Sequence, residues 1–158
     1  MSIAIVLTGV PRWMVEDDVM PPDMEEGVNE PHITLYYFGE PGESDRKYYS
    51  EEAQFVADTF GPPKFRVAGY GMLGTEGAVV LFLNAVDETT RLIRASFNSS
   101  FGIEDEGSQH YPWISHTTIG YDVSLEGLDS FIGAEFEATA IEVWEGDERN
   151  RYGFTGMP

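Results

Sequence analysis

The order of strand-like and helix-like segments predicts an α+β domain built from two similar halves. Runs rich in β-branched and aromatic residues alternate with two amphipathic segments in the order β, β, α, β, β, α, β, β, β. A His-x-Thr pattern occurs once in each half. With 158 residues, 42% of them hydrophobic, the chain suits one domain over residues 1–158 that can bury a substantial core.

Each element has a local signal in the sequence. Strands are predicted at residues 3–7, 32–38, 64–70, 78–84, 113–121, 136–144 and 151–154. Helices are predicted at 44–60 and 87–101, where Ser44 and Asp87 can cap the first turns. The first helix is expected to turn its large apolar side chains inward: Tyr48, Phe55, Val56 and Phe60. Residues 11–30 are predicted to form a long loop, and its length makes a functional role plausible.

Charge is the strongest compositional feature of the chain. The 28 acidic residues outnumber the 9 basic ones, which gives a formal net charge of -19 at pH 7. Such a surface repels long phosphodiester chains, because binding them relies on many Lys and Arg contacts. The same acidity also keeps a protein soluble, and this simpler explanation does not exclude the first. A substrate that contains phosphate is therefore expected to be small, and no long nucleic acid is expected as a partner.

The sequence carries no sign of export or of a membrane. No stretch approaches the roughly 20 apolar residues that span a bilayer, and residues 1–7 lack the basic flank of a signal peptide. The absence of cysteine excludes disulfides and thiolate zinc sites. We expect a cytoplasmic protein with no membrane partner, and we favour a monomer.

One motif fails on its context. Residues 69–74 satisfy the spelling G-x-G-x-x-G after a predicted strand. The next segment is another strand, whereas a dinucleotide site needs a helix whose N-terminus holds the pyrophosphate. We therefore do not expect dinucleotide binding here.

The most informative residues are two of the three histidines. His32 is followed two residues later by Thr34, and His116 by Thr118. Residues i and i+2 of a strand share a face, so each pair places an imidazole beside a hydroxyl. Two histidines on opposite sides of one phosphorus can act as base and acid, and hydroxyls can donate hydrogen bonds to the non-bridging oxygens. We predict these four side chains to be catalytic, with no metal or other cofactor required.

At this point the chain resembles the 2H (two-histidine) phosphoesterase superfamily and its LigT-like fold. The resemblance rests on IAIVLTGVP, PHITLYYFGE, VAGYGMLGTEGAVVLFLNA, the second motif and AIEVWEGDERNRYGF. It implies a bilobal fold in which two antiparallel sheets surround a central groove, with helices outside and both motifs facing the groove. It also implies metal-independent action on RNA-type phosphodiesters or 2',3'-cyclic phosphates. Two features depart from the family pattern: Thr117 is usually apolar, and the approach WIS lacks the usual proline.

The resemblance leaves several functions open. Combined with the acidic surface, it favours cleavage of small cyclic oligonucleotide signals, as by phage enzymes that counter CBASS immunity, which would act in the host cytoplasm. A 2',3'-cyclic phosphodiesterase or 2'-5' RNA ligase-like enzyme is the alternative. A nucleotide-sequestering protein without catalysis is a second one. A zinc site from His32, His110 and His116 is a weaker reading, because no carboxylate stands at a familiar spacing.

Further residues are candidates for substrate contact. Aromatic side chains that can stack on bases are Tyr36, Tyr111, Trp113 and Trp144, of which Tyr36 is expected to share the face of Thr34. Arginines that can reach phosphate are Arg12, Arg149 and Arg151, and His110 is a candidate helper near the second motif.

Overall fold

The fold is that of a computed structural model, which describes residues 3–11, 31–39, 45–73, 77–101, 114–121, 124–145 and 148–156. In chain order the elements are β1 (Ile3–Thr8), β2 (His32–Gly39), α1 (Asp45–Thr59), β3 (Lys64–Leu73), β4 (Ala78–Ala85), α2 (Thr89–Phe101), β5 (His116–Tyr121), the 3₁₀ helix η2 (Leu128–Phe131), β6 (Glu135–Glu137), β7 (Ala140–Glu145) and β8 (Glu148–Gly153).

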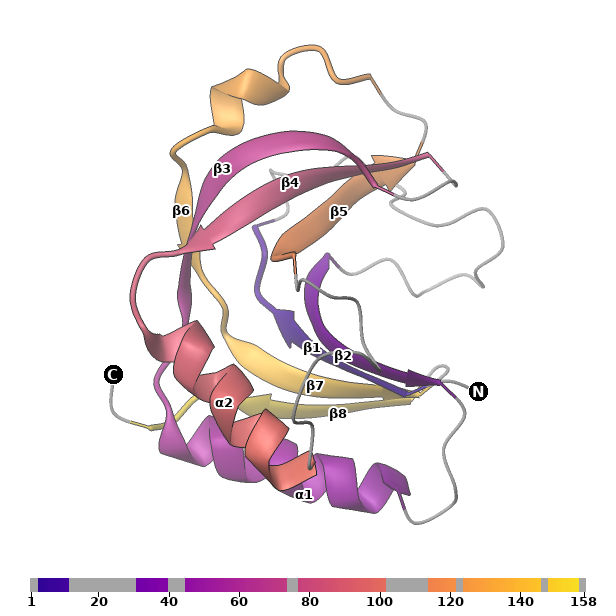
Figure 1. The fold of residues 1–158 in the computed structure, drawn as a ribbon, viewed down its shortest axis with the longest axis vertical. Coiled ribbons are helices and arrows are strands. Elements are labelled where there is room, and N and C mark those ends of the chain that lie inside the picture. Colours follow the sequence, from indigo (N-terminus) through magenta and orange to yellow (C-terminus); the bar gives the residue numbers. More distant parts are fainter. Residues whose placement is uncertain are drawn as a thin grey trace.

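The strands form two antiparallel sheets of four strands each. The first sheet has the order β2-β1-β7-β8 and the second sheet the order β5-β4-β3-β6. Both sheets are curved and lie one above the other in the view of Figure 1. The predicted α+β class with two antiparallel sheets is confirmed. None of the helices in the described part of the chain is long and apolar enough to cross a membrane.

The single strand predicted at 136–144 is wrong, because these residues form two strands in different sheets. β6 pairs with β3 in the second sheet, and β7 pairs with β1 in the first sheet. The chain changes sheets at Thr139, whose backbone N–H donates to Thr8 O at 2.8 Å. Phe136, Ala138 and Ala140 are all buried, so alternate residues remain apolar across the break. The sequence pattern therefore cannot reveal it.

Helix α1 packs closely on the first sheet with small side chains. It lies against β7 and β8 (Figure 1) and buries Ala53, Val56 and Ala57. Two of the large side chains expected to face inward are instead exposed, Tyr48 by 41% and Phe55 by 58%. The prediction of which α1 side chains face inward was therefore partly wrong. A helix that lies close to a sheet favours small residues such as alanine at the contact.

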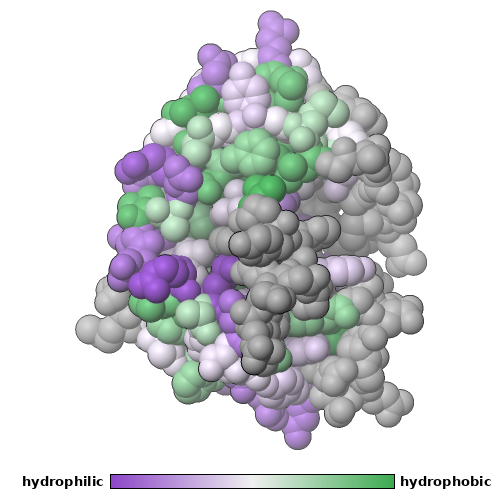
Figure 2. Space-filling view, viewed as in Figure 1, coloured by the Kyte–Doolittle hydropathy of each residue, from purple (hydrophilic) through white to green (hydrophobic). Residues whose placement is uncertain are grey.

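The surface in Figure 2 has separate apolar and hydrophilic regions. Figure 2 shows apolar side chains gathered over the region of β3 and β4, while hydrophilic side chains lie mainly toward the margins. One continuous hydrophobic cluster joins residues of β1, β7 and α1 with residues of β3, β4 and β5. This shared core holds the two sheets in a defined arrangement.

Candidate active site

Strand β2 presents the first motif on one face. His32 and Thr34 are partly exposed, whereas Ile33 and Leu35 are buried. Alternate residues of a strand point to opposite faces, so the imidazole and the hydroxyl share a face. We call this surface of the first sheet the His32 face.

Strand β5 presents the second motif in the same manner. His116 and Thr118 are partly exposed, and Thr117 and Ile119 are buried at 0% and 1% exposure. The corresponding surface of the second sheet is called the His116 face.

The two motifs share a backbone irregularity as well as a sequence. The register between β1 and β2 skips Leu35, and the register between β4 and β5 skips Ile119. Each skipped residue directly follows the threonine of a motif. Such β-bulges re-aim side chains and are common next to active sites. The two halves of the chain therefore repeat one local structure around each His-Thr pair.

The motif strands lie beside each other although they belong to different sheets. β2 is an edge strand of the first sheet and β5 an edge strand of the second sheet. Cα atoms of β2 and β5 approach within 8 Å, and Figure 1 shows the two strands next to one another. The fold thus places the two strands that carry the His-Thr pairs side by side.

A backbone carbonyl determines the tautomer of His116. Nδ1 of His116 lies 2.7 Å from Ile114 O. A carbonyl oxygen only accepts hydrogen bonds, so Nδ1 carries the proton and donates it. In the neutral ring, Nε2 is then the nitrogen with a free lone pair, and it is the atom able to accept a proton.

The ring of His32 packs against Trp144 of β7. Their ring centroids are 4.4 Å apart with an interplanar angle of 57°. The guanidinium carbon of Arg149 lies 4.1 Å from the Trp144 ring centroid. Because only 7% of Trp144 is exposed, the indole supports His32 and offers little surface to a nucleobase, contrary to the stacking role expected.

A buried carboxylate organises the same part of the His32 face. Glu142 is 3% exposed; its Oε1 accepts from Trp144 Nε1 at 3.0 Å and its Oε2 from Arg151 Nη1 at 3.0 Å. Nη1 of Arg151 also donates to Thr8 Oγ1 at 3.4 Å, and Nη2 donates to Thr139 Oγ1 at 3.3 Å. Its side chain remains 54% exposed. Sequence reasoning missed Glu142, although an acid in the apolar run AIEVW was an available signal.

The expectation for Tyr36 is wrong. The bulge at Leu35 reverses the alternation, so Tyr36 points to the face opposite Thr34 and is 1% exposed. Its hydroxyl lies 3.1 Å from Arg94 O and 2.5 Å from Asn98 Oδ1, both on α2. In return, Arg94 Nη1 donates to the carbonyl of Leu35 at 3.0 Å. Tyr36 therefore ties β2 to α2 and is not available to a substrate.

Several predicted contacts lie outside the described residues. These are Arg12, His110, Tyr111, Trp113 and most of loop 11–30. The alternative zinc site depends on His110 and so is not tested. Within the described ranges, no group of three or more His, Cys, Asp or Glu side chains could hold a metal ion.

The sequence matches the family model of the 2'-5' RNA ligase superfamily over residues 25–150. This match spans most of the chain and includes both motifs. The chain therefore belongs to this superfamily of 2H phosphoesterases, and the resemblance seen in the sequence is confirmed.

Solved structures support the fold independently. The protein TT0787 of Thermus thermophilus aligns with a TM-score of 0.64 at 14% identity, covering 100% of both chains. E. coli LigT complexed with NADP+ aligns with a TM-score of 0.58 at 13% identity, covering 97% of this chain and 94% of LigT. A structure described as a phosphoesterase gives 0.55 at 13% identity, covering 98% and 95%. No curated protein matches the sequence. At these identities the solved structures establish a LigT-like fold and nothing further.

Proposed function

We propose that this protein is a metal-independent phosphodiesterase that cleaves RNA-type phosphodiester bonds in a small substrate. The observation that carries the proposal is that the two bulged strands β2 and β5, each with a partly exposed His-Thr pair, lie side by side. Membership of the 2H phosphoesterases supports the reaction class.

The four side chains have complementary tasks in this reaction. One imidazole removes the proton of the 2'-hydroxyl as this oxygen attacks phosphorus. The other imidazole protonates the leaving 5'-oxygen as its bond to phosphorus breaks. Thr34 and Thr118 donate hydrogen bonds to the non-bridging oxygens, where negative charge increases. Hydrolysis of the resulting 2',3'-cyclic phosphate uses water as the nucleophile, and the two histidines can then exchange roles.

This division of labour predicts a bell-shaped dependence of kcat/KM on pH. One histidine must be neutral and the other protonated in the active form, so activity falls on both sides of an optimum. A profile that stays flat from pH 5 to pH 8 would contradict an acid/base pair of histidines.

The favoured substrate is a cyclic oligonucleotide signal of the kind used in antiviral immunity. The net charge of -19 disfavours long nucleic acids. On the His32 face, the half-exposed Arg151 can meet a phosphate of a compact substrate. Cleavage of such a signal would fit a role in immune evasion in the host cytoplasm.

A second candidate follows from the family itself. The matching model is named for 2'-5' RNA ligases, and the fold is shared with E. coli LigT. This favours action on 2',3'-cyclic phosphates or 2'-5' linkages in RNA, by hydrolysis or by ligation. Both candidates use the same two histidines and differ in substrate.

Product analysis distinguishes the candidates. The protein is incubated in EDTA with cyclic di- and trinucleotides, 2'-5' oligoadenylate and 2',3'-cyclic mononucleotides, and the products are separated by chromatography. We expect cleavage of the cyclic oligonucleotides, and a decrease in kcat of about 10²- to 10⁴-fold in His32→Ala and His116→Ala. Circular dichroism of both variants checks that they are folded.

Other outcomes have distinct meanings. Cleavage confined to the 2',3'-cyclic mononucleotides or to 2'-5' oligoadenylate would favour the RNA-processing candidate. Substrate that stays intact but is depleted from the free pool would identify a sequestering protein and contradict catalysis.

A further inference from the structure

The second sheet carries an aromatic side chain next to the second motif. Phe82 of β4 is the direct cross-strand neighbour of His116. Directly opposed residues of an antiparallel pair project to the same side, so the phenyl ring lies on the His116 face. Phe82 is only partly buried, and it is not a member of the hydrophobic core cluster.

On its other side Phe82 is bordered by two residues without side chains. Gly69 of β3 pairs with Phe82, and Gly71 pairs with Val80. A Cβ atom at Gly71 would lie 3.1 Å from Phe82 Cε2, so the ring extends over this glycine. A Cβ atom at Gly69 would meet no atom within 4 Å. The space above Gly69, next to the ring of Phe82, is therefore open.

The first sheet differs at the equivalent positions. Across the first sheet, the neighbours of His32 are Thr8 on β1 and then Ala140 on β7. The neighbours of Thr34 are Val6 on β1 and then Glu142 on β7. The matching rows of the second sheet run from His116 to Phe82 and Gly69, and from Thr118 to Val80 and Gly71. The two halves repeat the same motif, but the second sheet has Gly69 and Gly71 where the first sheet has Ala140 and Glu142.

The two faces also differ in charge. The His32 face holds Glu142, Arg149 and Arg151 in contact with one another or with Trp144. Around His116, the neighbours identified by the register are Val80, Phe82, Gly69 and Gly71, which carry no charge. An uncharged aromatic surface favours a planar, uncharged group.

We infer that Phe82 and the space above Gly69 form a nucleobase subsite beside His116. The subsite receives the base of the nucleotide whose phosphate lies between the two histidines. The phosphate-bearing part of a larger substrate then extends over the His32 face toward Arg151. This inference rests on the proposed function, because it assumes that the substrate is a nucleotide.

The test compares binding of a probe with a base and a probe without one. Affinities for 3'-AMP and for inorganic phosphate are measured by isothermal titration calorimetry on the whole protein. Gly69→Val fills the open space, and Phe82→Leu removes the aromatic ring. We expect each change to weaken 3'-AMP binding about tenfold, because stacking on one base contributes on this scale. Phosphate affinity is expected to stay the same.

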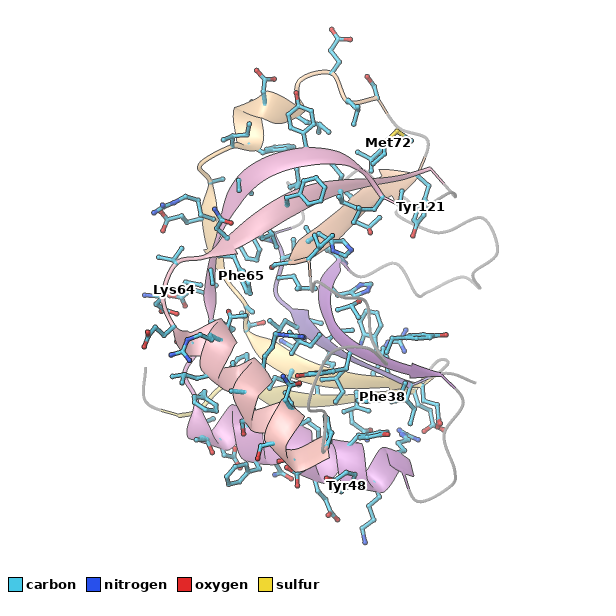
Figure 3. All side chains as sticks on the ribbon, viewed as in Figure 1. Phe38, Tyr48, Lys64, Phe65, Met72 and Tyr121 are labelled. Atoms are coloured by element: carbon cyan, nitrogen blue, oxygen red, sulfur yellow. The ribbon has the colours of Figure 1, made fainter. Side chains whose placement is uncertain are left out.

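Two further variants separate the subsite from general damage. Phe82→Trp keeps an aromatic surface and is expected to retain 3'-AMP binding. Met72→Val is the control on the same strand as Gly69. Met72 pairs with Val79, and its side chain is 58% exposed near the free end of β3 (Figure 3). This variant is expected to bind 3'-AMP like the wild type. The melting temperature of Gly69→Val should be unchanged or higher, because valine is favoured in strands.

The outcomes that overturn the inference differ from those that overturn the proposed function. Unchanged 3'-AMP affinity in Gly69→Val and Phe82→Leu, or an equal loss of phosphate affinity, would refute the subsite even if the wild type cleaves nucleotides. Selective loss of 3'-AMP binding in a protein that cleaves no substrate would support the subsite and refute the phosphodiesterase.

Discussion

The hydrogen bond from His116 to Ile114 O shows how one backbone atom can fix the tautomer of a histidine. The carbonyl holds the proton on Nδ1, so Nε2 is left to exchange a proton with a substrate. His32 has a different neighbour, the indole of Trp144. Each histidine therefore has a neighbour that can orient its ring.

Between His116 and Thr118, the side chain of Thr117 is buried in the opposite direction. It is 0% exposed, and its hydroxyl has no hydrogen-bond partner among the residues that the structure describes. A buried hydroxyl without a partner costs about 1 to 3 kcal/mol. Thr117→Val, which keeps the shape of the side chain, should therefore raise the free energy of unfolding by about 1 kcal/mol.

Urea denaturation checks this prediction. Thr118→Val is the matched control, because Thr118 is partly exposed and its hydroxyl is not buried without a partner. We expect the control to change stability by less than about 0.5 kcal/mol. Destabilisation by Thr117→Val would show that the Thr117 hydroxyl has a hydrogen-bond partner in the folded protein.

At the scale of elements, the bulges decide which side chains share a face with the two His-Thr motifs. Alternation along 32–38 correctly predicted that His32 and Thr34 share a face, because this stretch of the strand is regular. It failed at Tyr36, because the register skips Leu35. A bulge depends on pairing with a distant strand and on the contact of Arg94 with Leu35 O, and neither is a local property of the sequence.

The corrected position of Tyr36 leads to a prediction. Tyr36→Phe removes the hydroxyl that contacts Arg94 O and Asn98 Oδ1. Loss of this buried interaction should lower the free energy of unfolding by about 1 to 2 kcal/mol. The KM for the substrate identified by product analysis should stay within about twofold of the wild-type value, since a group that is 1% exposed does not contact the ligand. A large increase in KM with unchanged stability would restore Tyr36 as a substrate contact.

The crossover from β6 to β7 depends on a glycine at the end of β1. Gly9 has φ 107°, and a Cβ atom there would lie 2.7 Å from both Thr139 N and Thr139 Oγ1. Gly9→Ala should lower the free energy of unfolding by at least about 2 kcal/mol, from the steric overlap and the backbone strain together.

Gly153→Ala provides a close control in urea denaturation. Its Cβ would approach the same residue, but at an ordinary distance of 3.9 Å from Thr139 O. We expect its stability to stay near that of the wild type. If both substitutions changed the free energy of unfolding equally, the close contact with Thr139 would not be the reason why residue 9 is glycine.

At the scale of the whole molecule, net charge opposes compaction. With a formal charge of -19, repulsion between carboxylates destabilises the folded state, and salt screens this repulsion. Raising NaCl from about 0.05 to 0.5 M should therefore increase the melting temperature by several degrees. KCl should raise the melting temperature by the same amount as NaCl, because screening does not depend on the identity of the ion. A melting temperature that falls with salt would show that attractive ion pairs dominate.

The sequence by itself determined the superfamily and the class of fold. The repeated His-x-Thr motif, the order of strands and helices and the acidic composition are readable along the chain, because they depend on residue identity and short-range periodicity. They led to the superfamily that the family model confirms.

Only the tertiary structure decided which side chains meet. It split 136–144 between two sheets, turned Tyr36 toward α2, placed Trp144 against His32 and paired Glu142 with Arg151. It also set Phe82 beside His116 and opposite Gly69. All of these follow from strand register and from the packing of segments far apart in the chain, which cannot be read from the local pattern of any one strand.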